Sequence, residues 1–211
     1  MNGLIGKKLG MTQVYDDAGR HVPVTVIAAG PCVVVQRKTA ARDGYDAVQL
    51  GFGPQKESRV TKASLGRFKK AGVPAQGVVR EVRVAADAEL KEGAEVTAAI
   101  FEGVSHVDIS GVTKGQGYQG VVKRHRMGGG PQSHGHMSHR RIGAIGQRTW
   151  PARIMKNKRM PGHMGNLNVT TQNLRVVQVR PQDNVILVEG AVPGPTGGLL
   201  LVKKSLKKAA K

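Results

Sequence analysis

The chain has 211 residues, a formal net charge of +19 and a sequence pI of about 10.6, enough length for one good core or two small ones and a charge that suits a polyanionic partner. The sequence contains no apolar run of about 18 residues and no signal-peptide pattern after Met1. We therefore expect a cytoplasmic protein, without a membrane span and not secreted. The single cysteine, Cys32, excludes an internal disulfide and a zinc site with several cysteines.

Short β-branched runs dominate the first third of the chain. Residues 22–27 and 32–35 are two such runs, separated by the turn residues Ala29-Gly30-Pro31, and residues 46–52 alternate as a half-buried strand does. Residues 61–71 predict a helix, because Ala63, Leu65 and Phe68 are apolar and two lysines precede Gly72.

Strand patterns continue on both sides of a long interruption. Residues 77–84, 96–101 and 106–112 predict strands before it. After it, residues 174–179 and 185–188 predict a hairpin around Pro181-Gln182-Asp183-Asn184, and residues 199–202 a last strand. Many short strands joined by turns favour a mainly β fold, either a closed barrel or a sandwich.

Positive charge is concentrated in one internal segment. Residues 109–182 contain 13 Lys or Arg and no Asp or Glu over 74 residues, whereas the segments on either side each have a net charge of +3. A solvated protein surface usually mixes both signs. The segment is therefore expected to lie among phosphates, and a basic disordered loop is the alternative.

Residues 123–164 do not have the pattern of a core element. The interval is rich in glycine and proline, and its apolar residues are scattered. Ordering some forty residues costs about 1–2 kcal/mol each in backbone entropy, and long irregular insertions are usually functional or disordered. We predict an extended basic arm that gains fixed structure when packed into nucleic acid.

The candidate nucleic-acid contacts are cations, histidines and one tryptophan. Arginine binds phosphate in a bidentate fork, lysine adds a compact charge, and histidine donates to phosphate or base edges. The predicted residues are Lys114, Lys123, Arg124, His125, Arg126, His134, His136, His139, Arg140, Arg141, Arg148, Trp150, Arg153, Lys156, Lys158, Arg159 and His163. A solvated surface role is the alternative for any single arginine, and a core position is the alternative for Trp150, which otherwise stacks on a base.

Two other patterns, one inside the arm and one before it, suggest sites that the surrounding sequence disfavours. His134, His136 and His139 could suggest a metal site, but no carboxylate lies near them and the positive charge disfavours a divalent cation, so we predict no metal and no cofactor. Residues 115–120 fit Gly-x-Gly-x-x-Gly, yet neither a convincing helix nor a suitably placed acidic residue follows, which disfavours a dinucleotide site.

Several motifs in the chain are similar to those of the ribosomal protein L3 family. They are GLIGKKLGMT at 3–12, DISGVTKGQGYQGVVKR at 108–124, SHR at 138–140, GAIG at 143–146, KRMPGHMG at 158–165 and GAVPGPTG at 190–197. The motifs stand in family order along nearly the whole chain. Gln116 departs from the family, which usually has a basic residue there. Thr149 occupies the position at which some bacterial members carry a methylated glutamine. That modification is therefore not expected in this chain.

The resemblance implies a fold and a function. The fold would be a translation-factor-like β-barrel over residues 1–122 and 165–211, with a short helix and an rRNA-threading arm at 123–164. The protein would be a structural, non-enzymatic part of the large ribosomal subunit that binds 23S-type rRNA, nucleates assembly and extends its arm toward the peptidyl transferase centre. Proteins similar to L14 and L19 would be its neighbours, and no membrane or small-molecule substrate is expected.

Two rival functions make different predictions. A protein that compacts nucleic acid without a defined site would bind arbitrary duplex DNA as well as large-subunit rRNA. A histidine-metal hydrolase would hold stoichiometric zinc and lose its activity on His136→Ala.

Overall fold

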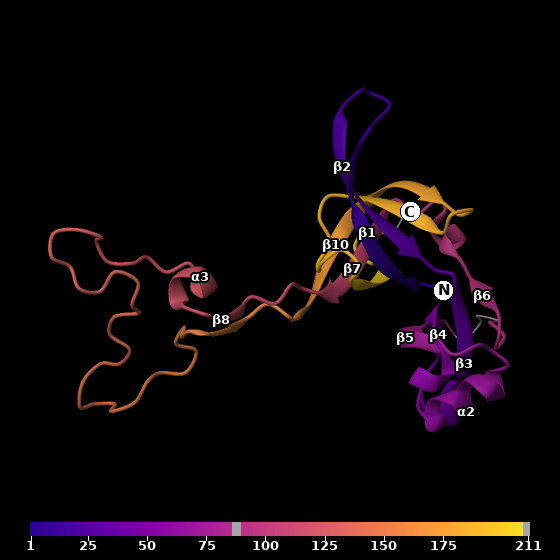
Figure 1. Ribbon diagram of the computed structural model, residues 1–211, viewed down its shortest axis with the longest axis horizontal. Helices are drawn as coiled ribbons and strands as arrows, with labels where there is room; N and C mark the ends of the chain where they lie inside the picture. The colour runs from indigo at the N-terminus through magenta and orange to yellow at the C-terminus, as the bar shows by residue number, and fades with distance from the viewer. Residues whose placement is uncertain (86–89, 209–211) are drawn as a thin grey trace. The chain divides into compact units, whose positions relative to one another are not determined.

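Six antiparallel strands close on themselves in the order β1-β12-β7-β10-β11-β2 in the computed structural model, which describes residues 1–85 and 90–208 (Figure 1). β1 pairs with both β12 and β2, and this double pairing closes the ring. Closure removes the two free edges that an open sheet exposes. The strands are β1 (Gly3–Tyr15), β2 (His21–Ala29), β7 (His106–Val112), β10 (Asn168–Arg180), β11 (Val185–Glu189) and β12 (Leu199–Lys204).

The barrel strands are rich in aliphatic residues, and in β12 burial alternates along the strand. In β12, Leu200 and Val202 are buried, whereas Leu199 and Lys203 are exposed. Side chains that alternate across a pleated strand put one set into the barrel and leave the other outside.

A second sheet has the order β5-β4-β3-β6. In the described part of this region, two α-helices and two 3-10 turns accompany these strands. The elements are β3 (Cys32–Lys38), α1 (Ala40–Asp43), β4 (Ala47–Pro54), η1 (Glu57–Arg59), α2 (Lys62–Ala71), β5 (Gln76–Arg83), β6 (Glu95–Val96) and η2 (Ala98–Phe101).

Helix α2 packs one apolar side chain against this sheet. Phe68 is buried in a small cluster with Val35 and Ala75. The helix ends at Gly72, whose φ of 65° is the left-handed conformation that glycine adopts without strain.

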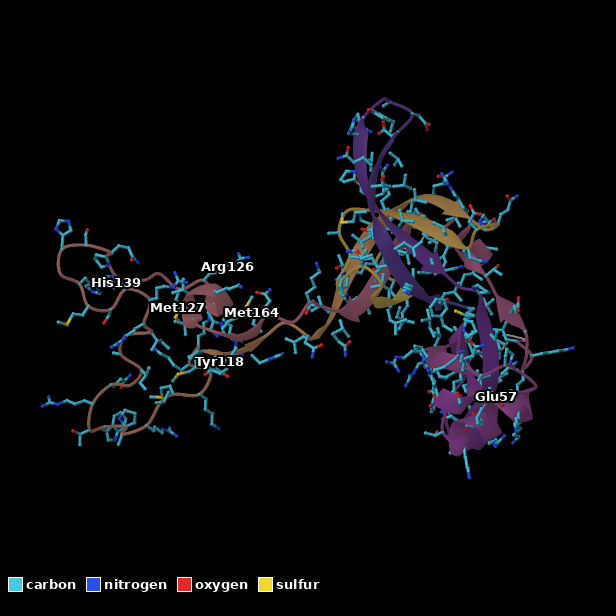
Figure 2. All side chains as sticks on the ribbon, in the orientation of Figure 1. Glu57, Tyr118, Arg126, Met127, His139 and Met164 are labelled. Carbon is cyan, nitrogen blue, oxygen red and sulfur yellow. The ribbon has the colours of Figure 1, made fainter. Side chains whose placement is uncertain are left out.

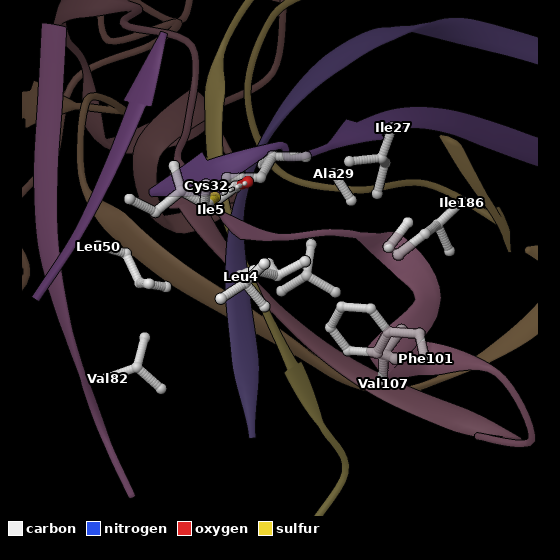
Figure 3. Packing of buried hydrophobic residues seen from close by; sticks show 14 of the residues in the cluster. Leu4, Ile5, Ile27, Ala29, Cys32, Leu50, Val82, Phe101, Val107 and Ile186 are labelled. Carbon is white, nitrogen blue, oxygen red and sulfur yellow. Dashed lines mark hydrogen bonds between the residues drawn. The ribbon is translucent and has the colours of Figure 1, made fainter. Parts of the chain in front are cut away.

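One continuous core lies under both the barrel and the second sheet (Figure 3). Leu4 and Phe101 are fully buried there, together with Leu50 of the second sheet. Cutting such a leucine back to alanine typically costs about 2–5 kcal/mol. The Cys32 thiol is also buried and donates to the Ile5 carbonyl at 3.4 Å, and burial raises its pKa to about 11. Cys32 therefore stays an unreactive thiol at neutral pH.

A buried lysine holds the loop that precedes β12. Lys8 is only 8 % exposed, and its ammonium donates to the carbonyl oxygens of Val192 at 3.3 Å and Gly194 at 3.5 Å. Its backbone N–H donates to Gly198 at 2.9 Å, and its carbonyl accepts from Gly197 at 2.7 Å. The glycine-rich motif at 190–197 thus has a structural role, because its carbonyls satisfy a charge inside the protein.

An exposed polar cluster joins β3 to β5. The Lys38 ammonium lies 2.7 Å from the Glu81 carboxylate, and the Tyr45 hydroxyl donates to Glu81 at 2.8 Å. Lys38 and then Tyr45, through their hydrogen bonds, hold the pKa of the Glu81 carboxyl below its usual value. The carboxylate is therefore charged at neutral pH and contributes to this sheet's stability there.

The chain divides into two compact units, which are described separately. The first unit comprises residues 1–112 and those from 168 onward, and the second comprises Thr113–Leu167. The barrel and the second sheet both belong to the first unit. In the described part of the chain, no helix is long and apolar enough to cross a membrane.

The mainly β fold predicted from the sequence is confirmed, as are the helix at 61–71 and the hairpin around 181–184. The strand predicted over 96–101 is wrong beyond Val96, because Ala98–Phe101 forms a 3-10 turn that buries Ala98 and Phe101. The long strand β1 was not predicted as a strand. The expected likeness to translation-factor barrels stays a prediction.

Candidate nucleic-acid interface

The second unit begins and ends in a narrow stem. The Thr113 N–H donates to the Leu167 carbonyl at 3.0 Å, and the Gln116 N–H donates to the Met164 carbonyl at 2.9 Å. Strands β8 (Gly117–Gln119) and β9 (Gly162–Met164) then pair antiparallel. Gly165 has a φ of 77°, and a Cβ there would collide with the Lys114 carbonyl oxygen. The two chain segments approach this closely because the residue at 165 has no side chain.

A short helix with a clamp continues the stem. Helix α3 (Val121–His125) buries Val121. From its last turn, the Arg124 guanidinium donates to the Met160 carbonyl at 2.7 Å, and His125 Nε2 lies 3.0 Å from the same oxygen. Two of the predicted nucleic-acid contacts therefore help to close the second unit on itself.

This helix bears on the glycine pattern at 115–120. No convincing helix was expected to follow that pattern, and α3, which begins directly after Gly120, has only five residues. The preceding strand β8 pairs with β9 in a two-stranded ribbon. A dinucleotide site needs a βαβ unit with a full helix, so five residues of helix after a ribbon still do not make one.

The histidine-rich segment folds back on itself. The Gly130 N–H donates to the His139 carbonyl at 3.0 Å, and His139 Nδ1 donates to the Pro131 carbonyl at 3.0 Å. His136 Nδ1 accepts from the Ser138 N–H at 3.3 Å. These rings stabilise the turn of the loop.

The same geometry bears on the metal alternative. Nδ1 of both His136 and His139 is already hydrogen bonded within the loop. Among residues 1–85 and 90–208, no group of three or more His, Cys, Asp or Glu side chains is placed to hold a metal ion. The arrangement gives the hydrolase interpretation no support.

The rest of the loop presents its side chains to solvent. Residues 126–161 contain no helix or strand, only an isolated bridge between Arg148 and Pro151. Trp150 is 84 % exposed, which rules out the core position that was its alternative. An exposed indole is free to stack on a base or to fill a cleft in a partner.

The electrostatics of the second unit are one-sided. It carries 11 Lys or Arg and no Asp or Glu, so its cations have no carboxylate within the unit to pair with. The ion pairs found in the described residues, such as Arg175 with Glu189 at 2.6 Å, all belong to the first unit. Uncompensated charge on an extended surface produces strong attraction to phosphates and a steep dependence on salt.

The predicted site residues all lie in this second unit. Arg124 and His125 are half-buried in the clamp, and the other fifteen are exposed. Sequence reasoning missed Tyr118, which is 75 % exposed on β8 (Figure 2). The available signal was an aromatic residue in the glycine-rich, carboxylate-free stretch at 115–120.

Figure 2 shows how the labelled side chains are distributed over this unit. Tyr118 and Met164 lie on the ribbon, Arg126 and Met127 lie at the end of α3, and His139 lies on the loop beyond the helix. Side chains project outward along the loop, as they do when a segment is covered by a partner and not by its own core.

Comparison with known proteins gives a consistent answer. The family model described as ribosomal protein L3 matches residues 55–185. The large ribosomal subunit protein uL3 of Syntrophotalea carbinolica is 52 % identical over 206 residues, which cover 97 % of this chain and 98 % of that protein. The match spans the first unit and the whole basic loop.

Proposed function

Because the chain belongs to the ribosomal protein L3 family, we propose that it binds large-subunit rRNA directly and that its second unit, Thr113–Leu167, is the rRNA-binding arm. Proteins of this family are structural components of the large ribosomal subunit and not enzymes. In bacteria, that subunit works in the cytoplasm.

The observation that carries the proposal is the charge of the second unit. Eleven cations without a carboxylate would repel one another strongly in isolation, and phosphates are the natural counter-charge. Each cation that neutralises a phosphate also releases a condensed counterion. The arm thereby allows rRNA helices to approach one another.

The structure of the arm supports a contact with folded RNA. The stem and the clamp at Met160 fix the two ends of the loop, while its exposed arginines and Trp150 are free for contacts. Shape and phosphate recognition suits folded RNA. The first unit, with its continuous core, provides a stable platform that anchors the arm.

Three further parts of the proposal come from the family. The protein nucleates assembly of the large subunit, its arm runs toward the peptidyl transferase centre, and proteins similar to L14 and L19 lie beside it. The arm supports the geometry of the catalytic RNA through contacts and charge, without a chemical step of its own.

Sedimentation of the protein with subunits tests the proposal. A lysate is fractionated on a sucrose gradient before and after a high-salt wash, and the chain is detected in each fraction. We expect it in the large subunit even after the wash. Sedimentation at the top of the gradient, or release together with DNA, would favour the compaction function instead.

A deletion assigns the effect to the arm. Removing residues 126–162 keeps helix α3 and most of the stem, and takes away the exposed loop together with the Met160 carbonyl and Gly162 of β9. We expect the barrel to fold, by circular dichroism, while subunit assembly or translation is impaired. Normal subunits in the deletion strain would contradict an RNA-binding role for the arm.

A further inference from the structure

A cavity of about 450 Å³ lies within the second unit, beside the beginning of α3. Three segments that are distant in sequence line it. They contribute Val121 from α3, Ser138, Arg140, Arg141 and Ile142 from the loop, and Pro161 from the segment before β9. Its volume falls in the range of about 300–1,000 Å³ that is typical of sites for small ligands.

The fold of the second unit itself holds these segments together. The clamp from Arg124 and His125 to the Met160 carbonyl keeps Pro161 beside α3. The bond from Gly130 to the His139 carbonyl closes the turn next to Ser138. The cavity is therefore a consequence of hydrogen bonds inside this unit.

The chemistry of the lining is divided. Val121, Ile142 and Pro161 give it an apolar part, and Val121 is buried. Arg140 and Arg141 are exposed and lie at the same cavity without a carboxylate anywhere in the unit. A matching ligand has an apolar face of limited size together with hydrogen-bond acceptors and negative charge.

A nucleotide of RNA has this combination. Its base offers a flat apolar face and acceptor atoms on its edge, and its phosphate carries the negative charge. Proteins that read RNA commonly take up single unstacked bases and contact them with apolar side chains and arginine. A free inorganic anion would leave the apolar part of the lining unused.

We infer that this cavity binds one unstacked nucleobase of the large-subunit rRNA, with Arg140 and Arg141 on the adjoining phosphate. The inference rests on the proposed function, because it presumes that the second unit lies against rRNA. It adds a defined pocket with a single-base ligand to a surface that is otherwise characterised by its charge.

Chemical probing of the rRNA bases in isolated large subunits tests the inference. Ile142→Trp places extra bulk in the cavity where a base would lie, and Met155→Trp places similar bulk at an exposed apolar residue of the arm that does not line it. The double variant R140Q/R141Q leaves the apolar lining intact and removes the charges. Reagents that modify the pairing edges of all four bases are applied to subunits carrying each variant.

We expect one nucleotide to lose its protection in Ile142→Trp and in R140Q/R141Q, but not in Met155→Trp. If both cavity variants are incorporated into subunits and no base changes its reactivity, the inference is overturned while the proposed function stands. Equal changes in the Met155→Trp control would overturn it too. Absence of the wild-type chain from the subunits would refute the proposed function as well.

A crosslinking experiment gives a second, independent readout. A photoreactive amino acid replaces Ile142 in the full chain, and the subunits are irradiated. Attachment to one rRNA nucleotide supports the inference, and attachment to a neighbouring protein overturns it.

Discussion

Replacing Lys8 with methionine removes the charge that holds the loop before β12. Methionine keeps the length and apolar stem of lysine, but the carbonyl oxygens of Val192 and Gly194 lose their donor. A buried polar group left without a partner costs about 1–3 kcal/mol. Relief from burying an ammonium opposes this loss, yet removing one partner of a buried interaction is usually the larger effect. We therefore expect the free energy of unfolding to fall by about 1–3 kcal/mol.

Thermal unfolding of the full chain, followed by circular dichroism, measures the effect. In a domain of this size each kcal/mol shifts Tm by about 2–4 °C, so a fall of roughly 2–12 °C is expected. Lys7→Met is the matched control, because Lys7 is the adjacent residue, carries the same charge and is exposed. Its Tm should change little. Equal shifts for the two variants would refute the idea that the buried hydrogen bonds of Lys8 stabilise this loop.

Three further substitutions test separate parts of the structure. Gly165→Ala should distort the stem and so speed amide exchange at the Gln116 N–H. Gly128→Ala, whose added methyl group meets nothing within 4 Å, should leave that exchange unchanged. Unchanged exchange in both variants would contradict the close approach of Gly165 to the Lys114 carbonyl. Glu81→Gln should lower the free energy of unfolding by up to about 1 kcal/mol at pH 7. The pKa of Glu81 is lowered from 4.5 in the folded state. Its contribution to stability is therefore complete above pH 4.5 and disappears as the pH falls through the folded-state pKa. A difference between the two proteins that does not depend on pH in denaturant titrations would contradict this contribution. Trp150→Ala should leave Tm unchanged, because the side chain is 84 % exposed, but weaken rRNA binding by about 1–3 kcal/mol; unaltered affinity in a filter-binding assay would count against stacking.

Local patterns in the sequence were sufficient for the elements that depend on neighbouring residues. The hairpin of β10 and β11 follows from short runs rich in Val, Ile and Leu on both sides of the turn residues 181–184. Helix α2 follows from its apolar spacing and from Gly72 at its end. In each case the information lies within about a dozen residues.

Closure of the barrel depends on distant parts of the chain. β1 pairs Leu4 with Val202, almost the full length of the chain away, and the glycines and lysines of β1 obscure its alternation. The apolar run at 96–101 was misassigned for a related reason, because a short buried run has no period that separates a strand from a turn. Contact of Phe101 with the core, and not local preference, decides its conformation.

The candidate site was predicted from composition, and the structure adds contacts within the arm that composition does not reveal. The absence of carboxylates identified the arm and its cations, because charge is visible in the sequence. Which cations point outward was not visible, and Arg124 with His125 proved to bind the Met160 carbonyl. The path of the backbone brings Met160 to α3, and no pattern in either segment encodes that path.

The most direct test of the central claim measures how binding to large-subunit rRNA depends on salt. One variant changes Arg140, Arg141, Arg148, Arg153 and Arg159 to glutamine, and the control changes the exposed first-unit residues Lys56, Arg59, Lys62, Lys69 and Lys70 in the same way. Each phosphate contact contributes about 0.7–0.9 to the slope of log affinity against log salt, so the arm variant should flatten that slope by up to roughly 3.5–4.5. The control should change it much less. Equal flattening in the two variants would contradict an rRNA-binding arm and would indicate binding through net charge alone.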